Sequence, residues 1–143
     1  LDVLTGRSFV SCNQASGDAR SPAWWAVDLG ATIRLQCNHY SLQSDGSGVK
    51  LIDWTLQGSN DGAAWDELRV HENDTTSWRN GAIISWPVSE KLLDNGNPAS
   101  YRYFRVIVTG NTALQAHKLA LCGIELYGYL DDSLQRVSAP ATL

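Results

Sequence analysis

The chain has no methionine, only two phenylalanines and no long hydrophobic run. None of its apolar stretches approaches the roughly 20 residues that a membrane-spanning helix needs. Basic residues are also few, because 11 Lys and Arg stand against 15 Asp and Glu and give a net charge of −4. No basic stripe exists, so nucleic acid is excluded as an expected partner, and binding to an anionic membrane surface is not expected either.

The sequence also lacks the short motifs that mark common catalytic and metal sites. It contains no GxSxG nucleophile elbow, no HExxH zinc motif and no glycine loop for phosphate. The three cysteines, Cys12, Cys37 and Cys122, include no CxxC pair, so a zinc site is not expected. An odd number of cysteines leaves at least one thiol unpaired, which favours a reducing, intracellular compartment. We therefore expect no enzyme, no catalytic residue, no metal and no cofactor.

What the sequence does contain is tryptophan, with six Trp and five Tyr in 143 residues. Hydrophobic residues make up 43% of the chain and charged residues 18%, a globular rather than a disordered composition. A chain of this length is enough for one domain with its own core. Trp and Tyr suit strands, interfaces and sugar-stacking sites alike. We expect at least four of the six tryptophans to fill a β core.

Alternating apolar and polar residues predict an antiparallel β protein. Residues 52–57 alternate with the period of a half-buried strand, and the Ser-Asn-Asp-Gly sequence at 59–62 allows a sharp reversal. The apolar pattern then resumes at Trp65, Leu68 and Val70, which completes a hairpin. With about eight short strands and almost no helix, the chain is predicted to form an all-β antiparallel sandwich or squat barrel.

The strongest strand is predicted over residues 101–109, where apolar residues crowd towards the end. Arg102 and Arg105 within it differ by three positions, so their side chains face opposite sides of the strand. We expect one of them to pair with a carboxylate at the edge of the core, such as Asp28 or Glu125. The other arginine is expected to be exposed.

Three further features of the chain are predicted from local patterns. Apolar residues occupy odd positions before Gly123 and even positions after it, so one extra residue, a β-bulge, is expected there. Residues 89–95 are expected to form one helical turn, capped by its serine and with Leu92 and Leu93 facing inward. The polar residues 131–143 are expected to form a tail or linker after a domain over residues 1–130.

Four segments carry a resemblance to a known family. They are WAVDLG at 25–30, WTLQGSNDG at 54–62 with Trp65, YFRV at 103–106 and GIELYG at 123–128. In this order and at these intervals they resemble the discoidin family, also called coagulation factor V/VIII type C domains, over residues 22–129. This resemblance implies a galactose-binding-like jelly-roll fold.

Finer detail resembles the intracellular members of that family. The features are HENDT at 71–75, SWP at 85–87, YFRVIVTG at 103–110 and His117. They are similar to the copies found in HECT-type ubiquitin ligases and in BTB or kelch-type adaptor proteins. Secreted members usually join a cysteine near the start to one after the final strand, whereas Cys122 lies inside the last predicted strand. The resemblance therefore implies a cytoplasmic or nuclear recognition module.

For this family the resemblance points to loops at one end of the sandwich as the ligand-binding region. Trp78 is the tryptophan expected to be exposed in a loop, where it would anchor a peptide or stack on a sugar ring. The candidate ligand-binding residues are Gln43, Asp45, His71, Glu72, Asp74, Trp78, Arg79, Asn111, His117 and Lys118.

Three functions are compared on these grounds. The leading hypothesis is a non-catalytic module that binds a protein or peptide partner through the loops, for substrate recruitment or assembly in a larger ubiquitin-ligase or scaffold protein. The alternative is an extracellular carbohydrate-binding module, and the third is a stand-alone enzyme, which the missing motifs disfavour. Asp61, Asp74 and backbone carbonyls are also considered as ligands of a structural calcium ion, although the prediction remains that no metal is bound.

Overall fold

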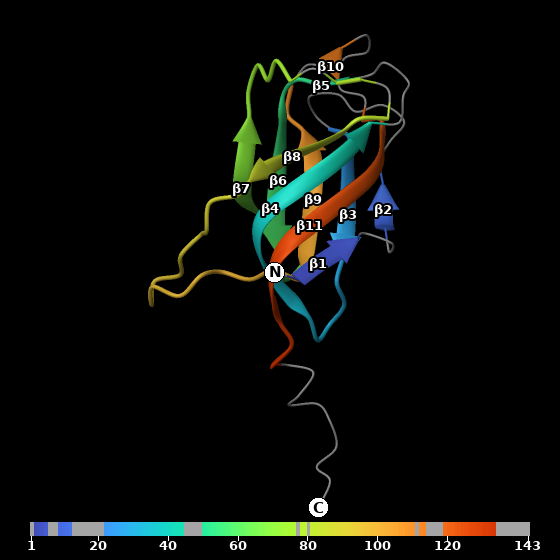
Figure 1. Cartoon of the computed structure of the whole chain (residues 1–143). Coiled ribbons are helices and arrows are strands. Elements are labelled where there is room, and N and C mark those ends of the chain that lie inside the picture. The colour runs from blue at the N-terminus through green and yellow to red at the C-terminus, as the bar shows by residue number, and fades with distance from the viewer. Residues whose placement is uncertain are drawn as a thin grey trace, which may run out of the picture.

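In the computed structural model, two antiparallel sheets lie face to face and form a β sandwich (Figure 1). The structure describes residues 2–5, 9–12, 22–44, 50–76, 78–79, 81–110, 112–113 and 119–133. Every helix-or-strand element in these ranges is a strand, and no helix there is long and apolar enough to cross a membrane. The antiparallel sandwich predicted from the sequence is therefore confirmed.

Nine strands of the described chain form the two main sheets. The four-stranded sheet has the order β1 (Asp2–Thr5), β11 (Leu121–Asp131), β4 (Arg34–Ser44) and β8 (Ile83–Pro87). The five-stranded sheet has the order β2 (Phe9–Cys12), β3 (Trp24–Asp28), β9 (Tyr103–Val108), β6 (Trp54–Ser59) and β7 (Asp66–His71). A short ribbon pairs β5 (Lys50–Leu51) with β10 (Thr112–Ala113).

The core lies between the sheets because alternate residues of each strand point inward. In β9, Phe104, Val106 and Val108 are buried, while the residues between them are only partly covered. Four tryptophans join this core, as expected, and two lie partly exposed on the outer face of the five-stranded sheet. The buried four are Trp25, Trp54, Trp78 and Trp86, and the other two are Trp24 and Trp65.

The predicted hairpin and bulge are both present. Strands β6 and β7 pair directly, and in the turn between them the Asp61 carboxylate accepts hydrogen bonds from the backbone N–H groups of Ala63 and Ala64, each at 2.8 Å. The register of β11 against β4 shifts between Leu121 and Gly123, which confirms the bulge near Gly123. A second shift, between Tyr127 and Gly128, was not predicted.

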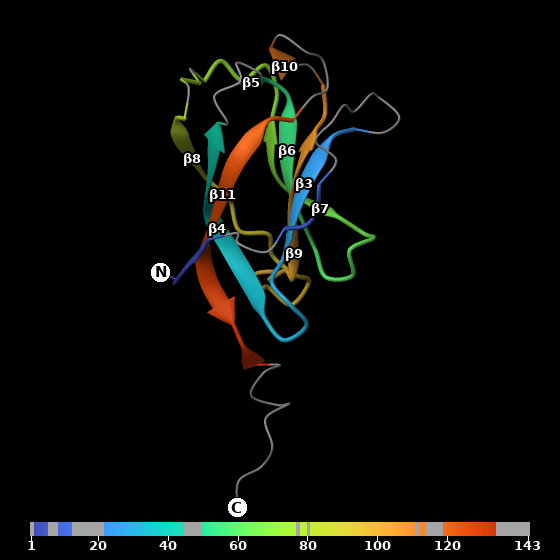
Figure 2. The ribbon, with the colours of Figure 1, turned by 90° about the vertical axis from the view of Figure 1, so that its right-hand side faces the viewer.

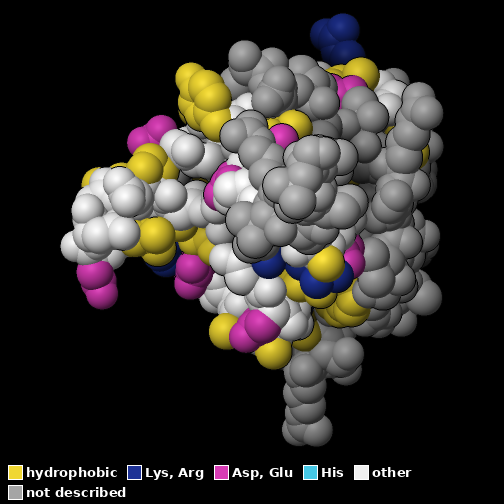
Figure 3. Space-filling model, turned by 90° about the horizontal axis from the view of Figure 1, so that it is seen from below, with side chains coloured by type: hydrophobic (Ala, Val, Ile, Leu, Met, Phe, Trp, Pro, Cys, Tyr) yellow, Lys and Arg dark blue, Asp and Glu magenta, His cyan; other side chains and the backbone are white. Residues whose placement is uncertain are grey.

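The helical turn predicted over residues 89–95 is wrong. Leu92 bridges to Pro98 across a narrow reversal, and the Ala99 N–H donates to the Lys91 carbonyl at 2.7 Å. The Asp-Asn-Gly-Asn sequence at 94–97 supplies strong turn residues, and they override the serine cap. Leu92 and Leu93 do not face inward but are 60% and 52% exposed. The view from below shows hydrophobic side chains on the projecting part of the molecule (Figure 3).

Arg105 of β9 and Arg102, the residue before that strand, are only partly placed as predicted. Arg102 pairs with Asp28, with Nε and Nη2 donating to the two carboxylate oxygens at 2.7 and 2.9 Å. Arg105 is not freely exposed, because its guanidinium lies over the ring of Trp65, 4.1 Å from the ring centroid. The turn that follows β6 brings Trp65 back across the sheet, a contact that the spacing along one strand does not reveal.

The strand directions give the sandwich two distinct ends (Figures 1 and 2). At one end, which we call the loop end, β4, β7 and β9 finish, and β6, β8 and β11 begin. The opposite end holds the connection at 29–33, the hairpin turn at 60–65 and the long connection at 88–102. Strand β11 runs towards that opposite end and extends to Asp131, and the predicted tail mostly lies outside the described residues, so the domain boundary at 130 stays a prediction.

Candidate functional site

The loops that the sequence analysis selected meet at the loop end. Asp53, between β5 and β6, joins two of them: its carboxylate accepts a hydrogen bond from the Asn73 N–H at 2.8 Å, and its carbonyl accepts one from the Thr109 N–H at 3.0 Å. The Ser44 N–H donates to the Ala82 carbonyl at 3.1 Å. Hydrogen bonds thus join Asp53 to Asn73 and to Thr109, and Ser44 to Ala82, so described residues of three connections are held together.

Gly110 is needed for this arrangement. A side-chain Cβ at that position would lie 2.6 Å from Asp53 Oδ2 and 2.8 Å from Asp53 Cβ, so even an alanine does not fit without movement. Asn73, opposite Gly110 across Asp53, has a left-handed backbone with φ of 48°, which asparagine tolerates well. Both residues let the neighbouring loops approach Asp53 closely. We call this arrangement of Asn73, Thr109 and Gly110 around Asp53 the frame of the loop end.

Beneath the frame lies a buried aromatic cluster that we call the inner cluster. His71, at the end of β7, stacks on Trp54 with ring centroids 3.9 Å apart and an interplanar angle of 8°. Trp78 and Trp86 pack edge-on or tilted against the same rings. The members of the inner cluster are Tyr40, Trp54, His71, Trp78 and Trp86.

A chain of hydrogen bonds runs through the inner cluster to the loop above it. The Trp54 Nε1–H donates to the Tyr40 oxygen at 3.0 Å, and the Tyr40 oxygen lies 2.6 Å from His71 Nε2. His71 Nδ1 lies 3.0 Å from Asp74 Oδ2. Because the Asp74 carboxylate only accepts, Nδ1 carries the proton of neutral His71, and Nε2 accepts from the Tyr40 hydroxyl.

Burial and hydrogen bonding together decide which of these hydrogen-bonded side chains carry a charge. Loss of water lowers the pKa of His71 below its ordinary value, against the opposing effect of Asp74, so His71 stays neutral near pH 7. Burial alone would raise the pKa of Asp74, but hydrogen bonds from Thr76 and His71 outweigh it and lower that pKa. Asp74 is therefore ionised and partly covered, with its oxygens directed to residues of its own loop.

These contacts correct the expected roles of three candidate residues. His71 and Trp78 are each only 3% exposed, so neither offers a surface to a ligand in this structure. Trp78 does lie in a loop, as expected, but its indole points inward and packs against Trp54 and Trp86. Its buried Nε1–H has no hydrogen-bond partner among the residues that the structure describes. His71 and Asp74 support the loop from below.

The remaining candidates divide into two groups. Glu72 and Arg79 are exposed on the loop end, where a ligand can reach them, and Gln43 lies near the end of β4 with its Nε2 3.5 Å from the Gly81 carbonyl. Asp45, Asn111, His117 and Lys118 lie outside the described residues. Their part in binding stays a prediction.

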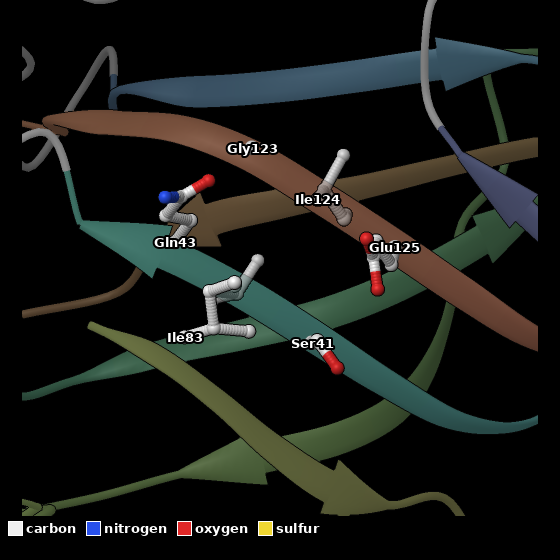
Figure 4. Close-up of a pocket in the computed structure, with 7 residues that line it drawn as sticks. Ser41, Gln43, Ile83, Gly123, Ile124 and Glu125 are labelled. Atoms are coloured by element: carbon white, nitrogen blue, oxygen red, sulfur yellow. The ribbon is translucent and has the colours of Figure 1, made fainter. Parts of the chain in front are cut away.

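A hollow that the sequence analysis did not foresee opens beside Gln43 on the outer face of the four-stranded sheet (Figure 4). Gln43 pairs with Gly123 on one side and with Ile83 on the other, and Gly123 has no side chain to fill the space. Ile83 is 61% exposed at its edge. The hollow has a volume of about 160 Å³ and is lined by Ser41, Leu42, Gln43, Ile83, Gly123, Ile124 and Glu125.

Only one signal in the sequence pointed to this hollow. The phase shift at Gly123 predicted a bulge, and bulges often reshape a sheet near a binding site. The sequence does not indicate that Ile83 is exposed, because the apolar pattern of β8 fits equally well a strand whose first residue is buried. The hollow adjoins the loop end, since β8 begins there and the Ser44–Ala82 hydrogen bond lies beside it.

The proposed calcium ligands do not come together. Asp61 lies in the β6–β7 turn at the opposite end, whereas Asp74 follows β7 at the loop end. Asp61 also directs its carboxylate to the N–H groups of its own turn, and these bonds lower its pKa. Across the described ranges, no group of three His, Cys, Asp or Glu side chains is placed to hold a metal ion.

Comparison with known proteins agrees with the fold and with the sequence resemblance. BTB/POZ domain-containing protein At2g30600 of Arabidopsis thaliana is 40% identical over 131 residues, which cover 89% of this chain and 15% of that protein. E3 ubiquitin-protein ligase Ufd4 of Drosophila melanogaster is 32% identical over 130 residues, which cover 90% of this chain and 5% of the ligase. The chain thus spans a small part of the length of both relatives.

Among solved structures, CBM32-3 from a family 31 glycoside hydrolase of Clostridium perfringens superposes with a TM-score of 0.58. The superposition covers 85% of this chain and 74% of the CBM32-3 chain. Because the sequence identity is 12%, the likeness concerns the fold alone. It confirms the galactose-binding-like jelly roll. The model of the F5/8 type C domain matches residues 3–121. This match covers most of the chain, and the protein therefore belongs to the F5/8 type C domain family, as its four sequence segments predicted.

Proposed function

We propose that this domain is a non-catalytic recognition module that binds a protein or peptide partner at the loop end. It serves substrate recruitment or assembly within a larger intracellular protein. The observation that supports the proposal is that the frame around Asp53 is fixed by hydrogen bonds and lies at the same end as the open hollow beside Gln43. The Asp53 hydrogen bonds hold the loops, and the hollow beside Gln43 offers an exposed aliphatic edge at Ile83.

The described chemistry of this end favours a peptide over a sugar. Sugar rings commonly stack on exposed aromatic side chains, but the aromatic rings of the inner cluster, which lie beneath the described loops, are buried. A peptide side chain fits a cavity of about 160 Å³, and the Gln43 amide offers a donor and an acceptor to a peptide backbone.

The same geometry argues against catalysis. His71 is buried with both ring nitrogens engaged, so it is not placed to act as a general base. The relatives support a role in recruitment, because one is named a ubiquitin ligase and the other a BTB/POZ protein, and the chain covers only 5% and 15% of them. The free thiols of Cys37 and Cys122 are compatible with a reducing intracellular compartment.

The test is a selection of peptides from a random library on the purified chain, followed by affinity measurements on the selected peptides by fluorescence anisotropy. The key variant is Ile83→Asp, which places a charge at the edge of the hollow. We expect it to weaken binding of the selected peptides by about tenfold or more, because a buried apolar contact is replaced by a charge that must lose water.

The matched control is Leu92→Asp, because Leu92 is 60% exposed and Ile83 61%, but Leu92 lies at the opposite end. It should leave peptide affinity unchanged. Equal losses in both variants would contradict binding at the loop end. A glycan array on the same protein tests the alternative, and glycans that bind in the absence of any selected peptide would replace the peptide proposal with a carbohydrate-binding function.

A further inference from the structure

A second cavity lies on the outer face of the five-stranded sheet, and none of the candidate residues named above belongs to it. We call it the outer-face pocket. It has a volume of about 170 Å³ and is lined by Trp24, Ala26 and Val27 of β3, Tyr103 and Arg105 of β9, and Gly62 and Trp65 of the β6–β7 turn. The pocket therefore combines three large aromatic side chains with one cation.

The sheet register explains why a cavity forms there. Ala26 stands directly opposite Arg105 on the neighbouring strand, and the residues on the outer face next to Ala26 along β3 are Trp24 and Asp28. A small alanine between larger neighbours leaves a depression in the surface. The hairpin turn then brings Trp65 over β9, where its ring lies in edge contact with Tyr103 at a centroid separation of 6.5 Å.

Arg105 is unusual because its charge is not compensated within the described structure. Its Nε–H donates to the Gln57 side-chain oxygen at 2.7 Å, and its guanidinium lies on the Trp65 ring. No ion pair among the described residues includes Arg105, and burial lowers its pKa. Arg102 differs in this respect, because Asp28 neutralises it with two hydrogen bonds.

An arginine that is half-buried, held flat on an aromatic ring and left without a carboxylate is prepared for an anionic ligand. The guanidinium has five N–H donors, and Gln57 uses only one of them. The remaining donors suit the two oxygens of a carboxylate, and the stacking on Trp65 fixes the plane of the guanidinium before a ligand arrives. The aromatic walls suit the apolar carbons next to such a carboxylate.

We propose that the outer-face pocket binds the carboxylate of an acidic peptide side chain, with Arg105 as the cation that recognises it. The volume of about 170 Å³ admits one side chain of the size of Glu, and the other lining residues include no lysine or second arginine that would favour a doubly charged phosphate. This site is separate from the loop end, so it does not rest on the function proposed above.

The test is a two-dimensional ¹H–¹⁵N NMR titration of the purified chain that follows the Trp65 indole and the Arg105 Nε signals. The probes are N-acetyl-glutamate N-methylamide and the matching glutamine compound, which differs only by an amide in place of the carboxylate. A single ion pair with partial burial gives affinities on the order of millimolar, so the titration extends to tens of millimolar. We expect saturable shifts with the glutamate probe and shifts at least about fivefold smaller with the glutamine probe.

Two arginine variants locate the interaction. Arg105→Gln should raise the dissociation constant of the glutamate probe about tenfold, while Arg69→Gln, on β7 and in the lining of neither cavity, should leave it unchanged. If Arg105→Gln loses its dispersed spectrum, Arg105→Lys provides the second variant, because it keeps the charge but not the planar fork of donors. It should weaken the probe about threefold to fivefold.

Three results would overturn the proposal. The first is an equal response to the glutamate and glutamine probes, and the second is an unchanged response in a folded Arg105 variant. The third is a tighter response of the same signals to glucuronate than to the glutamate probe, which would make the ligand a uronic acid instead of a peptide.

Discussion

The inner cluster and the outer-face pocket are built from the same kinds of side chain on opposite sides of one sheet. In the inner cluster, Trp54 is fully buried and stacks on His71, and the hydrogen bonds pass from one cluster member to the next. In the outer-face pocket, Trp65 is half-exposed and covers Arg105, whose charge meets no carboxylate in the described chain. Aromatic content therefore does not distinguish scaffold from site here.

What distinguishes the two regions is how their polar groups are satisfied. A buried polar network in which each donor meets an acceptor contributes to a unique, rigid structure. A polar group that is partly dehydrated and unpaired is costly until a ligand supplies its partner. By this criterion the hydrogen-bonded chain from Trp54 through Tyr40 and His71 to Asp74 is scaffold for the loop end, and the outer-face pocket is a binding site. The exception within the inner cluster is the buried Trp78 Nε1–H, which meets no acceptor among the described residues.

The largest effect that separates the two regions is expected from truncating their tryptophans. Trp54→Ala removes a fully buried ring from the core and should lower the free energy of unfolding by about 3–5 kcal/mol. Trp65→Ala removes a partly exposed ring and its cation–π contact and should cost only about 1–2 kcal/mol. Urea denaturation followed by circular dichroism measures both values.

Trp54→Phe is the control for this comparison, because it keeps an aromatic ring in the core but deletes the N–H that donates to Tyr40. It should cost clearly less than Trp54→Ala. Equal losses for Trp54→Ala and Trp65→Ala would show that the outer tryptophan also carries the fold, and the distinction between scaffold and site would fail.

The second effect is acid sensitivity of the inner cluster. Burial holds the pKa of His71 below 6.5 in the folded chain, so on acidification the unfolded chain takes up a proton before the folded chain does. Stability is therefore lost as the pH falls below about 6.5, the ordinary pKa of histidine. The lowered pKa of Asp74 adds a further loss only below its ordinary value of 3.8.

The measurement compares the free energy of unfolding near pH 7.5 and pH 5 in the wild type and in His71→Gln. The variant should lose much less stability between the two pH values, because glutamine does not titrate. A wild-type response retained in His71→Gln would assign the acid sensitivity to other groups.

The parts of the fold that the sequence predicted depend on short-range patterns. The hairpin followed from alternation and from the turn residues before Gly62, and the bulge followed from a phase change at Gly123. Both signals are contained within about ten residues of chain, where side-chain period and turn chemistry act directly. The same reasoning failed at 94–97, where two local signals competed and the turn residues prevailed.

The site was less predictable because it depends on contacts between distant segments. Trp78 has polar neighbours in sequence, and nothing local indicates that its loop folds over the core. His71 looked like a surface ligand until its partners at positions 40 and 54 were known. The pairing of Arg105 with Trp65 requires the hairpin turn to cross β9, a tertiary contact that no periodicity in one strand encodes.

The smallest effect is the energetic coupling between Trp65 and Arg105. A double-mutant cycle with Trp65→Ala and Arg105→Gln should give a coupling free energy of about 0.5–1 kcal/mol, the value of a cation–π contact near the surface. The cycle for Asp28→Asn and Arg102→Gln, an ion pair of similar exposure on the same sheet, provides the comparison. Both are measured by urea denaturation.

The salt dependence of the coupling free energy distinguishes the Trp65–Arg105 contact from the Asp28–Arg102 ion pair. Added salt should reduce the coupling of Asp28 with Arg102, because their charges are partly exposed and screened. It should change the coupling of Trp65 with Arg105 much less, because the aromatic ring carries no net charge. If the Trp65–Arg105 coupling is absent, the ring does not hold the guanidinium in place. In that case Arg105 would have to be ordered by its ligand, and the outer-face pocket would not be preformed.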